Sequence, residues 1–233
     1  MGIKERHDRD REAVQRAILD AARELFVNEG YQNVSIRKIA ERVEYSPAAI
    51  YGYFPSKDDI FFALAEEGFQ LLSQLVPDES SCGDLAPIDR VRHILWHMYE
   101  FSRQHPQYFA LMFIDRSVPR ISREYERFGL AREIKERLIA EIQRCVDADV
   151  FPATVHPAVA FRLLTMGLLG AAVMQLSQRL APGEDAGLIA ADILDVTLAG
   201  LKTGVALRSQ PFLCAGDGLN EPVVAHLSRE EPS

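Results

Sequence analysis

Cysteine is scarce in this sequence, which has only Cys82, Cys145 and Cys214 among its 233 residues. The three lie far apart, form no CxxC pair and have no histidine pattern beside them, so they favour a reducing compartment over a disulfide framework. The opening residues "MGIKERHDRDRE" are charged and lack the apolar segment of a secretory signal. Arg6 also stands where a myristoylation motif requires Ser or Thr. We therefore expect a cytoplasmic protein.

Long apolar runs are also missing. The longest uncharged run extends from Leu163 to Gln178 and includes Gln175 and Ser177. It is shorter than the roughly 20 apolar residues that span a bilayer, so it predicts a buried helix and no membrane partner.

Enzyme motifs are absent from the sequence, which has no HExxH, no GxSxG and no glycine-rich phosphate loop. Catalytic groups can converge from distant positions, so this absence does not exclude an enzyme, but no residue pattern points to one. We expect no catalytic residues, no metal and no cofactor.

Strand signals are scarce too, because no segment alternates apolar and polar residues and no hairpin dipeptide joins two apolar runs. Helical periodicity recurs instead and predicts an all-α protein with about nine helices. The predicted helices cover residues 10–28, 35–43, 47–54, 57–76, 87–104, 107–116, 122–147, 157–180 and 185–207.

The domain organisation follows from the connections between these helices. By composition, a boundary falls at the polar connector "PDESSCGDLAP", which contains Gly and Pro. The helix-turn-helix pattern described below instead ends the first domain at residue 56. We therefore predict an N-terminal domain over residues 10–56, a C-terminal domain over 57–207, and a tail over 208–233, where the periodicity is lost.

The net charge of −8 argues at first against a nucleic-acid partner. The charge is unevenly distributed, however. Residues 1–57 hold ten Lys and Arg against nine Asp and Glu, whereas the rest of the chain holds 16 against 25. The N-terminal end, at +1, permits a local DNA site, and the remainder, at −9, does not favour one.

The stretch "SPAAIYGYFPSKDD" contains two helix starts. Ser46-Pro47 is typical of a helix N-terminus, and Ser56 with Asp59 fits a capping box. The helices over 35–43 and 47–54 are therefore short and joined by a tight turn, which is the spacing of a helix-turn-helix. The alternative is a pair of core helices with exposed tyrosines.

Candidate DNA contacts follow from the side chains of this unit. The hydroxyls of Tyr51 and Tyr53 suit phosphate oxygens, and small residues beside them let the backbone approach base edges. Lys57 suits a phosphate at the start of the next helix, and Arg37 suits a base edge. The predicted DNA-binding residues are Ser35, Arg37, Ser46, Pro47, Ala48, Ala49, Tyr51, Gly52, Tyr53 and Lys57.

The segment "AILDAARELFVNEGYQNVSIRKIAERVEYSPAAIYGYFPSKDDIF" resembles the N-terminal domain of the TetR family of bacterial transcriptional regulators. The resemblance covers about residues 12–72, and beyond them only the length and helical character are similar. The matching features are Ala21-Ala22 with Leu25-Phe26, Gly30-Tyr31, Ser35-Ile36-Arg37-Lys38-Ile39-Ala40, Ser46, Ile50-Tyr51, Tyr53-Phe54 and Ser56-Lys57.

Two positions depart from the family pattern. Glu44 stands in the turn where the family usually has Gly, which implies backbone strain and repulsion of phosphate. Gly52 stands where many members carry a larger side chain, so direct base readout is expected to be thin.

The resemblance implies a repressor that binds double-stranded DNA at a palindromic operator and is released by a small molecule. Activation in place of repression is left open by the sequence. The alternative is a helical partner-binding protein that kept the fold and lost DNA binding.

The resemblance also implies a homodimer held by the last two helices, with a monomeric bundle as the alternative. The helix over 157–180 is apolar nearly all round, so it is expected to be buried on every side. The predicted interface residues are Phe161, Gly167, Gly170, Ala171, Met174, Ile193, Val196 and Gly200.

A small-molecule pocket is the third implication of the resemblance. The many aromatic and methionine side chains between residues 57 and 180 favour an apolar ligand, aromatic or acyl, over a sugar or a nucleotide. The predicted pocket residues are Trp96, Tyr99, Phe109, Met112, Phe113, Phe128, Phe161 and Thr165.

Asp89, His93 and His97 recur at four-residue spacing, which can present two ligands to a metal. They lie opposite the apolar stripe of the same helix. A solvated helix face is therefore the preferred interpretation, and a metal site is the alternative.

Overall fold

The computed structural model describes residues 3–75, 85–114 and 129–209, and within these ranges helices are the regular elements. The all-α prediction is confirmed. The elements are α1 (Ile3–Glu29), η1 (Tyr31–Asn33), α2 (Ile36–Arg42), α3 (Pro47–Tyr51), α4 (Lys57–Leu75), α5 (Pro87–Gln104), α6 (Pro106–Phe109), η2 (Ala110–Ile114, a π-helical turn), α8 (Gly129–Asp147), α9 (Pro157–Leu176) and α10 (Ala186–Lys202).

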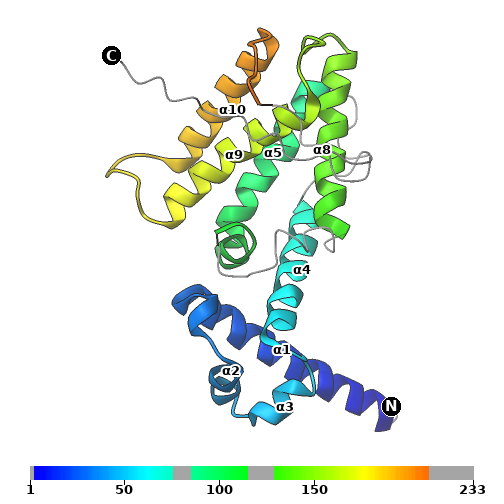
Figure 1. The fold of residues 1–233 in the computed structure, drawn as a ribbon, viewed down its shortest axis with the longest axis vertical. Coiled ribbons are helices and arrows are strands. Elements are labelled where there is room, and N and C mark those ends of the chain that lie inside the picture. The colour runs from blue at the N-terminus through cyan, green and yellow to red at the C-terminus, as the bar shows by residue number, and fades with distance from the viewer. Residues whose placement is uncertain (1–2, 76–84, 115–128, 210–233) are drawn as a thin grey trace, which may run out of the picture.

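The helices form two lobes that share α4 (Figure 1). In the lower lobe, α1 packs against α2 and α4, and α2 packs against α3. In the upper lobe, α9 packs most extensively against α10, and also against α5 and α8. Because α4 contacts α1 at one end and α5 and α8 at the other, it connects the two lobes.

An aromatic cluster fixes α4 to α1 in the lower lobe. The ring centroids of Phe26 and Tyr31 lie 5.3 Å apart, and those of Tyr31 and Phe61 lie 5.5 Å apart in an edge-to-face arrangement. Each ring is buried. Such pairs contribute about 0.5–1.5 kcal/mol beyond the apolar area they bury, so they hold the N-terminal end of α4 firmly in the lower lobe.

Several helix ends differ from the predicted ones. The predicted helix over 107–116 is a short α6 followed by the π-turn η2, and α3 ends at Tyr51 rather than at residue 54. The last helix ends at Lys202, because Gly204 adopts a left-handed conformation with φ of 69°. Residues 122–128 of one predicted helix and 210–233 of the predicted tail lie outside the described residues.

The apolar helix α9 is only partly buried within one chain. It is long and apolar enough to cross a membrane, as core helices of soluble proteins can also be. In this structure 39% of its most apolar part is buried. Leu163, Met166 and Met174 are exposed on it. Within the single chain α9 is therefore not buried on every side, and one of its apolar faces is exposed.

Candidate nucleic-acid interface and ligand cavity

The helix-turn-helix is closed by two serine caps and one left-handed residue. Ser35 accepts a hydrogen bond from the Lys38 amide (3.2 Å), and Ser46 accepts one from the Ala49 amide (3.2 Å). Between these caps Glu44 has a φ of 59°. This conformation is strained for a residue with a Cβ atom. Both predicted caps and the predicted strain at Glu44 are confirmed.

The outer face of this unit carries most of the predicted DNA contacts. Ile39, Ile50 and Phe54 are buried and direct one side of α2 and α3 into the lower lobe. The opposite side is free: the side chain of Arg37 is 81% exposed and Tyr51 is 54% exposed. The exposed members of the predicted set are Ser35, Arg37, Ser46, Pro47, Ala48, Tyr51 and Gly52.

The backbone conformation at position 52 does not require glycine. Its φ of −70° and ψ of −20° are open to any residue. A Cβ atom there would lie 3.2 Å from the carbonyl oxygen of Ala49, which is tight but small in consequence. The low surface at this position is thus free to serve close approach by another molecule.

Tyr45 is a candidate DNA contact that is not among the residues predicted from the sequence. It lies in the turn between the two helices, and it is 44% exposed. A large aromatic ring in the short turn of a helix-turn-helix is the signal that could have identified it. Its exposed ring stands beside the cap of α3 and extends the candidate interface.

Tyr53 is half-buried and shares a surface hollow with the N-terminal helix. The guanidinium of Arg11 lies 5.7 Å from the centroid of the Tyr53 ring. Asp10, Arg11, Gly52 and Tyr53 line this hollow. Arg11 is therefore a second candidate that the sequence pattern did not single out, because only the fold brings α1 beside α3.

Lys57 faces inward, although a phosphate contact was expected from it. Its ammonium donates hydrogen bonds to the main-chain carbonyls of Tyr31 (2.8 Å) and Val34 (2.9 Å), and lies 4.0 Å from the centroid of the Tyr31 ring. The Tyr31 hydroxyl in turn donates to Asp58. This geometry favours a structural role for Lys57 at the start of α4.

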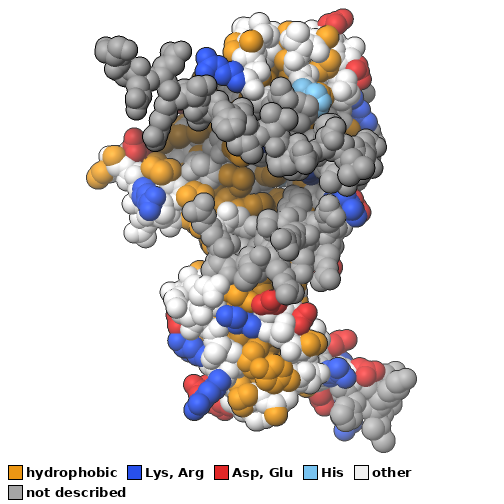
Figure 2. Space-filling view, viewed as in Figure 1, with side chains coloured by type: hydrophobic (Ala, Val, Ile, Leu, Met, Phe, Trp, Pro, Cys, Tyr) orange, Lys and Arg blue, Asp and Glu red, His pale blue; other side chains and the backbone are white. Residues whose placement is uncertain are grey.

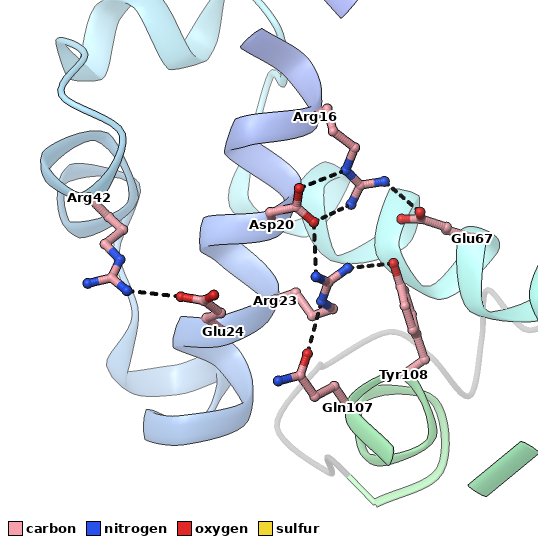
Figure 3. Close-up of polar contacts among 8 residues, drawn as sticks. All are labelled: Arg16, Asp20, Arg23, Glu24, Arg42, Glu67, Gln107 and Tyr108. Carbon is pink, nitrogen blue, oxygen red and sulfur yellow. Dashed lines mark hydrogen bonds and ion pairs between the residues drawn. The ribbon is translucent and has the colours of Figure 1, made fainter. Parts of the chain in front are cut away.

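A polar network joins the two lobes (Figure 3). From α1, Arg16 pairs with Asp20 (2.9 Å) and with Glu67 of α4 (2.5 Å). Also from α1, Arg23 pairs with Asp20 (3.0 Å) and donates to the Tyr108 hydroxyl of α6 (2.7 Å). Burial, and then the Glu67 carboxylate, raise the pKa of Tyr108. The network connects α1, α4 and α6 at one place.

Apolar packing reinforces the same junction. A Cβ atom on Gly68 would lie 2.4 Å from the Met112 sulfur and 3.3 Å from the Tyr108 ring. A larger residue at position 68 would therefore force the Met112 side chain to move, so glycine favours this close approach of η2 and α6 to α4. Met112, predicted to line a pocket, instead packs in this contact.

A cavity of about 300 Å³ lies between α4, α5, η2, α8 and α9. Three of the predicted pocket residues line it, namely Phe113, Phe161 and Thr165. Its other lining residues are Phe69, Leu72, Met98, Ala131, Ile134, Lys135, Arg162, Met166 and Leu169.

The remaining predicted pocket residues lie elsewhere. Tyr99 and Phe109 line a space of only about 10 Å³ next to the cavity, with which it shares Met98 and Thr165. Trp96 lines a different hollow between α5 and α10. Phe128 lies outside the described residues.

The predicted interface residues divide between outer and inner positions. Of the predicted residues, Val196 and Met174 are 72% and 39% exposed, and a Cβ atom on Gly170 or Gly200 would meet nothing within 4 Å. Other exposed apolar residues of the two helices are Leu163, Met166 and Leu188. Figure 2 shows hydrophobic side chains on the α9 and α10 side of the upper lobe.

Other predicted interface residues serve the protomer itself. A Cβ atom on Gly167 would lie 2.5 Å from the Ile193 side chain, so Gly167 allows α9 and α10 of one chain to approach. Ala171 is buried within the same chain. Phe161 is half-buried and lines the cavity. The sequence pattern of small residues predicts a close approach of two helices, but it does not indicate whether the second helix belongs to the same chain or to a partner.

Asp89 and His93 line the same hollow as Trp96. The rings of His93 and His97 lie 4.4 Å apart, and burial followed by the nearby His97 lowers the pKa of His93. Among the described residues, no group of three metal-ligating side chains is close enough to hold an ion. A solvated helix face stays the preferred interpretation.

Two family models match this chain. The model described as bacterial regulatory proteins, tetR family, matches residues 18–64. A second model, described as tetracyclin repressor-like, C-terminal domain, matches residues 91–197. Together they cover about two thirds of the chain.

Curated relatives match the N-terminal part. The HTH-type transcriptional regulator HbdR of Aromatoleum is 34% identical over 79 residues, which are 34% of each chain. An HTH-type transcriptional repressor of Mycobacterium tuberculosis is 35% identical over 71 residues, which are 30% of this chain and 38% of the relative. The chain thus matches less than two fifths of the length of these relatives.

Solved structures share the fold over about four fifths of this chain. The TetR family regulator PfmR from Thermus thermophilus is 23% identical, with a TM-score of 0.62, and the match covers 79% of this chain and 98% of that one. The regulator FadR from Bacillus subtilis, solved in complex with stearoyl-CoA, is 14% identical, with a TM-score of 0.63 over 79% and 97% of the two chains.

Proposed function

This chain belongs to the TetR family of bacterial regulatory proteins, and on that premise we propose that it is a DNA-binding transcriptional repressor of the cytoplasm whose operator is released by a small molecule. The family consists of regulators rather than enzymes. The observation that carries the proposal is the free outer face of the helix-turn-helix, which both serine caps and a buried inner face hold in place.

The DNA contacts divide by chemistry. Arg37 is exposed and paired only along its own helix, with Glu41 at 3.1 Å, so it can exchange this weak partner for a base edge. Tyr51 and Tyr45 present exposed rings whose hydroxyls suit phosphate oxygens. Ala48 and Gly52 leave room for the DNA backbone between them.

A homodimer follows from the uncovered apolar face of α9 and α10. Leu163, Met166, Leu188 and Val196 are exposed in one chain, and a second copy of the same face covers them. A two-fold axis then places two copies of α3 on one DNA duplex. The operator is accordingly a palindrome whose half-site spacing the dimer sets.

The effector occupies the cavity in the upper lobe. Its walls include α4, which continues into the lower lobe, and η2, which packs against α4 at Gly68. A ligand there reaches the DNA-binding unit through contacts that already exist. The stearoyl-CoA bound by the Bacillus subtilis FadR supports an acyl compound as one ligand class.

The test is a binding titration at low salt with duplex DNA from the region upstream of the gene of this protein. We expect saturable binding, and about tenfold weaker binding by Arg37→Ala and by Tyr51→Ala. Arg132→Ala, on an exposed site of α8, is the matched control and should bind as the wild type does. No binding by the folded wild-type protein would support the alternative, a helical partner-binding protein without DNA affinity.

A further inference from the structure

Two cationic side chains line the otherwise apolar cavity of the upper lobe. Lys135 of α8 and Arg162 of α9 both contribute to its wall, and both are half-buried. Long cationic side chains can line apolar surface with their stems while the charged ends reach water. That behaviour accounts for one such residue in a cavity wall, but here two neighbouring helices each contribute one.

These cations have no anionic partner in the described part of the chain. No hydrogen bond or ion pair joins Lys135 or Arg162 to another described side chain, and none of the described lining residues is acidic. Other described arginines of the upper lobe do have such partners, as Arg92 has in Asp195 and Arg144 in Glu141. In a region of net charge −9, two unpaired cations at one apolar cavity are a local exception.

We propose that this cavity binds a carboxylic acid with an apolar chain, whose carboxylate pairs with Lys135 and Arg162 while the chain lies among Phe69, Phe113 and Phe161. The proposal rests on the cavity being the effector site of the proposed function. It names the class of effector as an amphipathic anion rather than a neutral apolar molecule.

The spacing of the lining residues suits this arrangement. Lys135 follows Ala131 and Ile134 on one stripe of α8, and Arg162 precedes Thr165 and Met166 on one stripe of α9, at helical neighbour distances. Thr165 is buried, and its hydroxyl donates to the Phe161 carbonyl at 2.7 Å, which leaves the oxygen free to accept. The lining of the cavity therefore combines apolar side chains with two cations and one hydroxyl.

The volume limits the ligand. About 300 Å³ lies at the lower end of the range of roughly 300–1,000 Å³ that is typical of small-molecule sites. A single medium-length chain fits this space better than a fused ring system. The coenzyme part of an acyl thioester would have to remain outside.

Calorimetry with decanoate and 1-decanol tests the charge requirement, because the two probes share a ten-carbon chain and differ in the head group. We expect wild-type protein to bind decanoate at least about tenfold more tightly than 1-decanol. Lys135→Met and Arg162→Met should each weaken decanoate binding about threefold to tenfold and leave 1-decanol binding unchanged. Arg132→Met, which removes a charge from α8 outside the cavity, should change neither.

Three results would overturn the proposal. One is equal affinity of the wild type for decanoate and 1-decanol. Another is an equal loss of affinity for both probes in the Lys135→Met and Arg162→Met variants. The third is tight binding of decanoyl-CoA without binding of decanoate, which would assign the cations to the coenzyme phosphates. Unchanged 1-decanol binding in the variants also reports that the cavity is intact.

The proposed function is tested separately by adding decanoate to the protein–DNA complex. If decanoate binds through Lys135 and Arg162 but does not release DNA, the ligand class stands and ligand-controlled release fails. If decanoate does not bind but another compound releases the DNA, ligand-controlled release stands and the proposed ligand class fails.

Discussion

At the scale of single residues, Glu44 combines two effects that can be separated. Its φ of 59° costs an ordinary residue roughly 1–2 kcal/mol, part of which glycine avoids. We expect Glu44→Gly to raise the free energy of unfolding by about 0.5–1 kcal/mol, and Glu44→Ala, which keeps the Cβ atom, to give no such gain. Both remove a negative charge near the DNA, so both should tighten DNA binding equally.

Urea unfolding and DNA titration of the two Glu44 variants check these expectations. Equal stabilisation by glycine and alanine would show that the charge of Glu44, and not its backbone conformation, limits stability. Tighter DNA binding by the glycine variant alone would point to flexibility of the turn.

Lys57 is expected to act on stability rather than on DNA affinity. Lys57→Met removes two hydrogen bonds to main-chain carbonyls and the contact with the Tyr31 ring, at a cost of about 1–2 kcal/mol in unfolding free energy. The slope of DNA affinity against salt concentration should stay as in the wild type. A slope smaller by about one unit would instead show that Lys57 contacts a DNA phosphate.

Arg37→Met is the matched opposite of Lys57→Met. Its guanidinium is exposed and forms one ion pair within α2, so its loss should change the unfolding free energy by less than about 0.5 kcal/mol. DNA binding should weaken instead. Together the two variants separate the outer face of the helix-turn-helix from its internal support.

At the scale of elements, two glycines of α9 should give different results. Gly170→Arg places its side chain on the uncovered face, where a Cβ atom meets nothing within 4 Å, so the protomer should fold and fail to dimerise. Gly167→Arg collides with Ile193 of α10 and should destabilise the protomer itself. Sedimentation and thermal unfolding distinguish the two. A dimeric Gly170→Arg variant would remove this face of α9 from the interface.

Most helices could be predicted because their signals are local. Serine caps and a proline at the first turn place the start of α3 correctly, and the 3.6-residue period identifies α5, α9 and α10. The end of α10 carried a signal that was overlooked, since Gly204 follows the last turn. The π-turn η2 shows no comparable local signal in the sequence, since no glycine or proline marks residues 110–114.

At the scale of the whole molecule, the site was predictable where one segment forms it and unpredictable where several do. The exposed set on α2 and α3 follows from alternate buried and free faces of two adjacent helices. The role of Arg11 beside Tyr53, the inward turn of Lys57, and the division of the predicted pocket residues among three spaces all depend on contacts between distant segments. Helical periodicity identifies the apolar face of a helix but not the segment that packs against it.

The junction of α1, α4 and α6 is where the two lobes can influence each other. Its ion pairs are partly exposed, so each contributes little alone, but they are linked, because Arg16 pairs with both Asp20 and Glu67 and Asp20 pairs with both Arg16 and Arg23 (Figure 3). The tight contact between Gly68 and Met112 lies beside them. A ligand that displaces η2 must therefore change the packing of α4 and, through it, the lower lobe.

The central claim, that two copies of α3 read one duplex, is tested most directly by selecting bound sequences from a random DNA pool with the wild-type protein and with Gly170→Arg. We predict that the wild type enriches a palindrome whose half-site centres lie about one helical turn, or a multiple of it, apart. Gly170→Arg should enrich at most a single half-site. Enrichment of no sequence by the wild type, or of the same palindrome by a monomeric variant, would contradict the account.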